Sequence, residues 1–321
     1  MTSFAPIALF VYKRPAHTRC TLEALARNPE ARFSTLHVFC DGPEEHVPAA
    51  DRAAIAAVRR IVKEQKWCAG VQVHEREDNL GLAMSIRGGV SRMLNDHDRV
   101  IVLEDDIETS PGFLAYMNRA LDLYAEQARV MHVSGYLPST SHQSFLPESF
   151  FDPLMMCWGW ATWRRAWRES RWDGAQLLDD IRSSRHGTDR FNFHGAFPLT
   201  DQLIANLEGR INTWAVFWAA SIFLRNGLCL FPRKSLVQNI GTDGSGVHFT
   251  RAESRYHVRV ADHVELHPRA LRDSRIGRFY LRSFFLYGND STISRRLRCQ
   301  LGRWKHHVAA RLRSGPAPAG H

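Results

Sequence analysis

The sequence has no apolar run long enough to cross a lipid bilayer. Its longest runs, at residues 7–12 and 100–103, are far shorter than the roughly 20 residues that a transmembrane helix needs. No basic segment precedes the first apolar run, so we interpret that run as a β-strand and not as a signal peptide. These absences predict a cytoplasmic protein.

Two common phosphate-binding motifs are also missing. No Gly-x-x-x-x-Gly-Lys-Ser/Thr sequence occurs, which argues against a P-loop kinase or ATPase. No Gly-x-Gly-x-x-Gly follows the first apolar run, which argues against a dinucleotide oxidoreductase. The six cysteines have no short paired spacing, so zinc and disulfide frameworks are disfavoured and free thiols are expected. A phosphate site in this chain must therefore depend on a metal ion and arginine.

Hydrophobic residues make up 44% of the 321 residues, which is enough for a full core. Over the first 135 residues, strand-like segments alternate with helix-like segments, as in a series of βαβ units. The predicted strands are residues 7–12, 35–40, 71–74 and 100–103, and the predicted helices are residues 17–27, 49–65 and 81–94. The expected fold class is therefore α/β, with a mostly parallel sheet flanked by helices.

The composition changes twice along the chain. Residues 136–250 are rich in tryptophan, glycine and turn residues, unlike residues 1–135, and residues 251–321 end in a strongly basic segment. We therefore expect two halves of one domain, at 1–135 and 136–250, followed by a C-terminal helical extension with a basic amphipathic tail.

Three adjacent carboxylates end the strand predicted near residue 100. The segment reads Arg-Val-Ile-Val-Leu-Glu-Asp-Asp, so Glu104, Asp105 and Asp106 follow a strand that is apolar on both faces. Such a strand belongs inside a parallel sheet, and ligands bind at the carboxyl edge of such sheets. Adjacent carboxylates raise one another's pKa unless a cation neutralises them, and Mg²⁺ or Mn²⁺ with a phosphate bridge does so. The alternative is a solvated turn before a helix with Ser110 as its N-cap.

Other polar residues are expected at the same sheet edge. Arg14 and Asp41 each follow a predicted strand, and Arg87 lies on the helix that begins near Gly81. A nucleotide-sugar site needs a carboxylate for the base, a guanidinium for phosphate and a metal site for the diphosphate. Asp41 with Gly42 is equally an ordinary turn, and Arg87 is equally a solvated helical residue.

A resemblance to a known family rests on motifs spread over residues 5–250: Glu104-Asp105-Asp106-Ile107-Glu108, Pro111-Gly112-Phe113, Tyr116, Ser134-Gly135 and Gly159-Trp160. The chain resembles the GT-A glycosyltransferases around N-acetylglucosaminyltransferase I. It is closer still to bacterial sugar transferases of surface-polysaccharide assembly. The resemblance implies the Rossmann-like GT-A fold, with a nucleotide-sugar-binding half at 1–135 and an acceptor-binding, catalytic half at 136–250.

The same resemblance implies roles for the residues at the sheet edge. Asp106 would ligate Mn²⁺, or Mg²⁺, that bridges the diphosphate of a UDP-sugar donor. Arg14 and Asp41 would lie near the nucleoside, with Asp41 toward the uracil ring. Glu104 and Asp105 would contact ribose and sugar.

The catalytic base is the point at which this sequence departs from the family. An inverting transfer needs a carboxylate within reach of the acceptor hydroxyl, and in the family that aspartate follows a tryptophan. Here Ala215 follows Trp214. The candidates that remain are Asp201 and Asp243, and we prefer Asp201 because it precedes the helix-like run that leads to Trp214. A helix N-cap is the alternative role for Asp201.

Two further residues are assigned to the site. His248 follows a glycine-rich stretch, and a neutral imidazole there suits Mn²⁺ or the diphosphate; an ordinary loop histidine is the alternative. Trp160 is assigned to stacking on a sugar ring, with a place in the core as the alternative.

The net charge of +9 is concentrated near the C-terminus. Residues 295–313 carry seven Lys and Arg residues with apolar residues at helical spacing, which predicts a basic amphipathic helix. Such a helix fits an anionic membrane surface, on the inner face of the membrane; docking on the core and nucleic-acid binding are the alternatives. Nucleic acid is not expected as a partner, because it leaves the acidic sheet edge unexplained.

Together these interpretations predict a metal-dependent glycosyltransferase. It would move a sugar from a UDP-sugar, of the UDP-GlcNAc type, to a saccharide or lipid-linked glycan, with inversion as in the related enzymes. One alternative is a nucleotidyltransferase, which also pairs acids with a divalent metal. The other is a catalytically degenerate nucleotide-sugar or carbohydrate-binding protein, which Ala215 keeps open.

Overall fold

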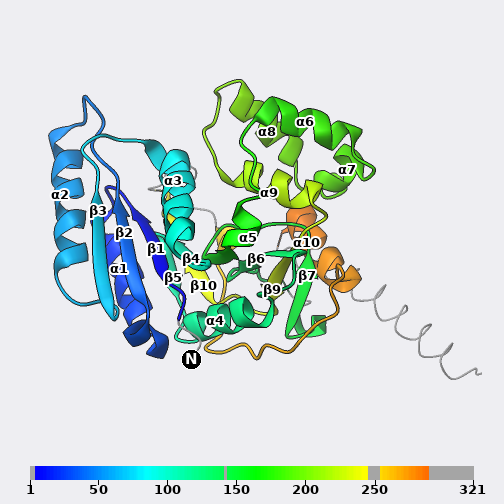
Figure 1. Ribbon diagram of the computed structural model, residues 1–321, viewed down its shortest axis with the longest axis horizontal. Coiled ribbons are helices and arrows are strands. Elements are labelled where there is room, and N and C mark those ends of the chain that lie inside the picture. Colours follow the sequence, from blue (N-terminus) through cyan, green and yellow to red (C-terminus); the bar gives the residue numbers. More distant parts are fainter. Residues whose placement is uncertain (1–3, 141–142, 245–253, 289–321) are drawn as a thin grey trace, which may run out of the picture.

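The computed structural model describes residues 4–140, 143–244 and 254–288, and a central eight-stranded sheet organises them (Figure 1). The strand order is β3-β2-β1-β4-β8-β6-β9-β7. The strands of this sheet are β1 (Ile7–Val11), β2 (Thr35–Cys40), β3 (Gly70–Glu75), β4 (Arg99–Glu104), β6 (Val130–Ser134), β7 (Ser149–Asp152), β8 (Trp160–Trp163) and β9 (Leu228–Pro232). A separate antiparallel pair joins β5 (Ile107–Thr109) to β10 (Val237–Asn239).

Most strands of the large sheet run in one direction. β3, β2, β1 and β4 pair in parallel, and β6 pairs in parallel with β9. Only β8, which is antiparallel to β4 and β6, and β7, which is antiparallel to β9, run the other way. The expected α/β class with a mostly parallel sheet flanked by helices is therefore confirmed. The strands and helices predicted over the first 104 residues are also present, with small shifts at their ends.

Ten helices of the described residues cover the sheet. They are α1 (Pro15–Ala26), α2 (Ala49–Lys63), α3 (Gly81–Asp96), α4 (Phe113–Leu123), α5 (Arg164–Trp167), α6 (Gly174–Ser183), α7 (Gly187–Phe191), α8 (Leu199–Leu207), α9 (Ala215–Leu224) and α10 (Arg275–Tyr287). Short 3₁₀ turns lie at η1 (Pro29–Phe33), η2 (Gln143–Phe145), η3 (Ile240–Asp243) and η4 (Ser254–Tyr256). In this part of the chain no helix is long and apolar enough to span a membrane.

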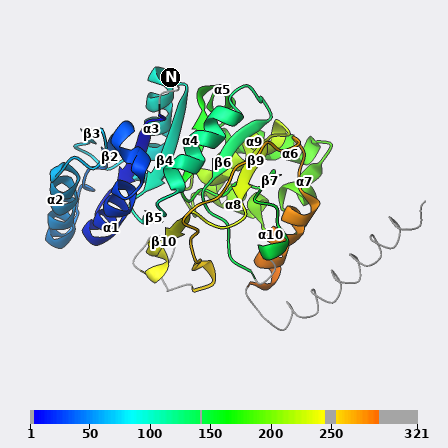
Figure 2. The ribbon, with the colours of Figure 1, turned by 90° about the horizontal axis from the view of Figure 1, so that it is seen from below.

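The order of the first four strands determines where a ligand can bind. The chain moves outward from β1 to β2 and β3, with α1 and α2 as the connections, and then returns through α3 to β4 on the other side of β1. Because crossover connections are right-handed, this reversal places α3 on the opposite face from α1 and α2 (Figure 2). The carboxyl ends of β1 and β4 therefore flank the switch point, where open α/β sheets bind ligands.

The tryptophan-rich segment forms the middle of the core. Trp160 begins β8 and is only 1% exposed. His132 stacks against its ring at 5.2 Å between centroids, and Trp214 stacks at 5.1 Å. Because His132 and Trp214 stack against the indole and the side chain is buried, its ring is not accessible to a sugar. The assignment of Trp160 to sugar stacking is corrected here, because pairing between β8 and β4 carries this residue into the sheet.

The parts proposed from composition share this sheet, because β4 of residues 1–135 pairs with β8 of residues 136–250. The C-terminal extension contributes η4 and α10 to the described residues. The basic segment 295–313 lies outside them.

Replacing Trp160 should reduce stability and should not act through a ligand. Trp160→Ala removes a fully buried indole, and we expect it to lower the free energy of unfolding by about 3–5 kcal/mol. Denaturant unfolding measures this change. Trp172→Ala, at a partly buried ring, is the control and should cost less; equal losses for the two variants would contradict the core role.

Candidate functional site

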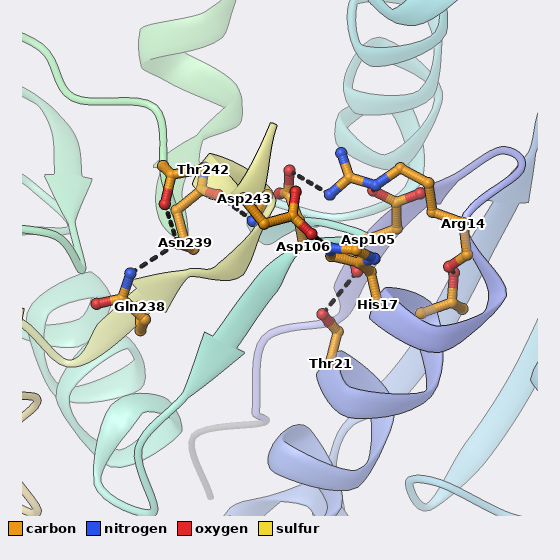
Figure 3. Close-up of polar contacts among 11 residues, drawn as sticks. Arg14, His17, Thr21, Asp105, Asp106, Gln238, Asn239, Thr242 and Asp243 are labelled. Carbon is orange, nitrogen blue, oxygen red and sulfur yellow. Dashed lines mark hydrogen bonds and ion pairs between the residues drawn. The ribbon is translucent and has the colours of Figure 1, made fainter. Parts of the chain in front are cut away.

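Arg14 meets Asp105 and Asp106 at the switch point between β1 and β4 (Figure 3), directly after Glu104 in the chain. Arg14 is the N-cap residue of α1, just after β1; Glu104 ends β4, and Asp105 and Asp106 follow it. Nη2 of Arg14 donates a hydrogen bond to Oδ2 of Asp106 at 3.0 Å, and its Nε lies 4.0 Å from Oδ1 of Asp105. One guanidinium thus faces two of the three acids.

The carboxylates remain electrostatically strained despite this contact. Burial raises the pKa of Glu104 well above its ordinary value, and the charges of Asp106 and Asp105 raise it further. Burial and the charge of Asp106 raise the pKa of Asp105 to about 7, although Arg14 and the backbone N–H of Tyr12 act in the opposite direction. A further positive charge at this position would therefore be stabilised.

The η3 turn closes over Asp106. The backbone N–H of Ile240 donates to the carbonyl oxygen of Asp106 at 2.9 Å. A Cβ atom at Gly241 would lie 2.2 Å from Oδ2 of Asp106 and 2.5 Å from Nη2 of Arg14, so a side chain there would displace this pair. On the other side of the turn, Oδ2 of Asp243 lies 3.1 Å from Nε2 of His17 on α1 (Figure 3). The turn is thus held against both α1 and the acid triplet.

One oxygen of Asp106 remains unsatisfied. Its Oδ1 is buried and has no hydrogen-bond partner among the described residues. No group of three or more His, Cys, Asp and Glu residues in this part of the chain is arranged to hold a metal by itself. Mg²⁺ and Mn²⁺ sites at phosphates, however, use one or two carboxylates and take their other ligands from substrate and water. The unsatisfied carboxylate oxygen fits that kind of divalent-cation site.

The carboxylate of Asp41 accepts hydrogen bonds from backbone N–H groups at the start of α3. It is 6% exposed, and its Oδ1 accepts hydrogen bonds from the N–H groups of Gly42 and Leu80 at 3.1 and 3.0 Å. Its Oδ2 accepts a third from the N–H of Gly81 at 2.9 Å. The carboxylate thus satisfies donors at the helix N-terminus, which the helix itself leaves without partners. Its contact with a uracil ring remains a prediction.

Arg87 binds an aromatic ring of the other half. Its guanidinium lies 4.8 Å from the centroid of Trp172, between α5 and α6, in a cation–π contact. It makes no described contact with Arg14 or the acid triplet. The arrangement therefore gives Arg87 a role in connecting α3 to the second half.

The two candidate bases lie in different places. Asp243 belongs to the η3 turn beside Arg14 and Asp106. Asp201 lies in the first turn of α8, exposed, and the N-cap of that helix is Pro198, so the capping alternative for Asp201 does not apply. His248 lies outside the described residues.

Three residues of the site had no role in the sequence interpretation. His17 and Gly241 touch the site from α1 and η3, as described above. Burial and the charges of Glu104 and Asp106 raise the pKa of the Cys157 thiol, which places this residue beside the acids. Their only sequence signals are that His17 lies near Arg14, and that Gly241 and Cys157 lie in turn-rich segments.

No protein-family profile matches this sequence, and no curated protein sequence matches it. Many solved structures align with parts of the chain, including the three that follow. A proposed nucleotide-diphospho-sugar transferase from Desulfovibrio desulfuricans is 12% identical, with a TM-score of 0.30, over 51% of this chain and 65% of that one. The galactosyltransferase LgtC, in complex with donor and acceptor sugar analogues, is 10% identical, with a TM-score of 0.32, over 68% and 70%. UDP-glucose pyrophosphorylase with UDP-glucose is 9% identical, with a TM-score of 0.36, over 74% and 94%.

The names of these three proteins describe two sugar transferases and an enzyme bound to UDP-glucose. At TM-scores of 0.30 to 0.36 the likeness assigns no function to this chain. Function must follow from the residues at the switch point.

Removing the Asp41 carboxylate should destabilise the start of α3. Asp41→Ala leaves three backbone N–H groups, one buried and two partly buried, without their acceptor, and we expect a loss of about 1–3 kcal/mol in the free energy of unfolding. Thermal or denaturant unfolding without ligand measures it. Asp78→Ala, at an exposed aspartate of the loop that leads from β3 to α3, should be nearly silent, and a silent Asp41→Ala would refute the capping role.

Proposed function

We propose that this protein is a glycosyltransferase of the GT-A type, which transfers a sugar from a nucleotide sugar to a saccharide acceptor. The observation that carries the proposal is the unsatisfied, buried Oδ1 of Asp106 beside Arg14 at the switch point of the sheet. The sheet edge carries three carboxylates and the guanidinium of Arg14. This combination suits a ligand that brings both negative charge and a metal ion, as a sugar nucleotide does.

The donor side of the site follows from these residues. Asp106, with Glu104 and Asp105 beside it, would hold Mn²⁺ or Mg²⁺, which when bound supplies positive charge against the leaving diphosphate. Arg14 lies beside Asp106. Once a cation neutralises the Asp106 carboxylate, the guanidinium can donate a hydrogen bond to a phosphate oxygen of the donor. The donor we propose is a UDP-sugar, of the UDP-GlcNAc type, with Asp41 near the base. His248 is proposed as a further donor-side ligand.

The acceptor side requires a proton acceptor. In an inverting transfer a carboxylate takes the proton of the acceptor hydroxyl on the side of the sugar opposite the diphosphate. Oδ2 of Asp243 already faces His17, next to the acid triplet and therefore on the diphosphate side. Asp201 has no described hydrogen bond or ion pair and is exposed on α8, so we propose Asp201 as the base.

The acceptor we propose is a saccharide or a lipid-linked glycan. A lipid-linked acceptor agrees with the basic segment 295–313, which we propose to lie on an anionic membrane surface on its cytoplasmic side. No observation in the described residues favours a nucleotidyltransferase over this function.

Replacement of Asp106 should weaken donor binding. For Asp106→Ala we expect UDP affinity in the presence of Mn²⁺ to fall at least about tenfold, because a direct ligand of the cation is lost. Isothermal titration calorimetry with UDP, with and without Mn²⁺, measures this. Glu108→Ala is the matched control, because that nearby carboxylate is exposed and pairs with Arg27 at 3.4 Å.

Two results would contradict the donor proposal: no Mn²⁺-dependent binding of UDP to the parent protein, or parental affinity in Asp106→Ala. UDP binding without transfer or hydrolysis of any UDP-sugar would instead favour the nucleotide-sugar-binding alternative.

The catalytic base can be identified by measuring kcat and UDP affinity separately for variants of the two candidate aspartates. Asp201→Asn should lower kcat by about 10²-fold or more with UDP affinity unchanged, because the proton acceptor is lost while the donor site is intact. Asp243→Asn should instead weaken UDP binding, because the contact of the η3 turn with His17 loses its carboxylate charge. Steady-state kinetics and calorimetry on both variants decide the assignment, and the reverse pattern would make Asp243 the base.

A further inference from the structure

Helix α10 is fixed to the sheet along one face. Oγ of Ser274 caps its first turn by accepting from the N–H of Gly277 at 3.1 Å. Gly277 lies so close to the ring of Phe150 on β7 that a Cβ would come within 2.3 Å of it. Nε of Arg278 donates to Oδ2 of the fully buried Asp152 at 3.2 Å. The orientation of the helix, and therefore of its outer face, is determined by these contacts.

The outer face of α10 carries an apolar stripe. Four large apolar side chains on it are between 37% and 45% exposed: Ile276, Phe279, Leu286 and Tyr287. At 3.6 residues per turn they fall on one arc about 100° wide, which lies beside the arc of the buried residues of the helix. Single exposed apolar residues are common on soluble proteins, but four on one helical face indicate a surface that is covered by a partner.

Positive charge borders this stripe. Arg275 is exposed, and Arg282 lies about two turns further along the same edge, where it also donates to the carbonyl oxygen of His194 at 3.2 Å. Helix α10 contains no Asp or Glu. The sequence that follows, residues 289–321, contains seven Lys and Arg residues and a single aspartate. The apolar stripe and its surroundings therefore favour an anionic partner.

We propose that the outer face of α10 docks on an anionic lipid surface, independently of the transferase activity. The stripe of Ile276, Phe279, Leu286 and Tyr287 enters the interface between headgroups and acyl chains, and Arg275 and Arg282 contact lipid phosphates. This surface is distinct from the segment 295–313 and lies on the folded domain itself. Two weak contacts of this kind, one on the domain and one on the tail, give the stable attachment that neither gives alone.

The side chains on this face favour anionic lipid over two other partners, the C-terminal segment of the chain and a nucleic acid. The C-terminal segment is itself basic, so packing it on a helix bordered by arginines would bring like charges together. A nucleic acid would satisfy the arginines, but its phosphate backbone gains nothing from aliphatic side chains such as Ile276 and Leu286. Anionic lipid satisfies both kinds of side chain.

The test uses the full-length protein and sedimentation with vesicles. The parent should bind vesicles of phosphatidylcholine mixed with phosphatidylglycerol, and should bind vesicles of phosphatidylcholine alone much more weakly. Phe279→Ser/Leu286→Ser should lower the affinity for the mixed vesicles about tenfold, because apolar area no longer enters the interface. Ile276→Ser/Tyr287→Ser is a second, independent pair. Leu207→Ser, at an equally exposed leucine on α8, is the matched control and should bind like the parent.

Melting temperatures measured beside the binding should equal that of the parent, because the substituted side chains are exposed. Parental binding by both double variants would overturn the proposal, because the tail alone would then account for attachment. Equal binding to both kinds of vesicle would overturn it as well. So would binding of duplex DNA that is as strong as vesicle binding and is lost in the same variants, because the face would then serve nucleic acid.

Discussion

Three carboxylates lie side by side at the end of β4, and the rest of the site is arranged around their mutual repulsion. The parallel pairing of β1 with β4 brings Arg14 to them, and its hydrogen bond to Asp106 offsets part of the repulsion. Burial still raises the pKa of Glu104 and Asp105, so the neutralisation is incomplete. The remaining charge is negative and Oδ1 of Asp106 has no hydrogen-bond partner among the described residues, and these two observations are the basis of the cation site that we propose.

Contacts from distant parts of the chain then set the shape of that place. The η3 turn comes against the acids only because β10 pairs with β5, which directly follows Asp106. Gly241 permits the close approach, and the contact between Asp243 and His17 joins the turn to α1. Asp41 supports the same edge less directly, by holding the N-terminus of α3 next to the end of β2. The residues that we propose for the donor side thus come from α1, the end of β4 and η3, while the proposed base lies on α8 in the other half.

Local pattern was sufficient for the first half of the fold. Alternating apolar strands and helix-like segments predicted β1 to β4 and the three helices between them, because each element is defined by nearby residues and connected by short crossovers. The second half contains short strands whose order depends on pairing across long stretches of chain, such as β8 between β4 and β6. Periodicity does not report such pairing, so Trp160 was assigned to a ligand although it lies in the core, and the contacts of His17 and Gly241 had no counterpart in the sequence.

The sequence by itself determined the α/β class, the carboxylate triplet at the end of a buried strand and the candidate residues Arg14 and Asp41 beside it, because strand hydrophobicity and the parallel sheet edge are local consequences of composition and order. Only the tertiary structure decided what these residues do to one another. It joined Arg14 to Asp106, used Asp41 at a helix N-terminus, placed Arg87 on Trp172 and separated Asp243 from Asp201. The physical reason is that hydrogen bonds and charge contacts act over a few ångströms, and long-range packing alone decides which residues come that close.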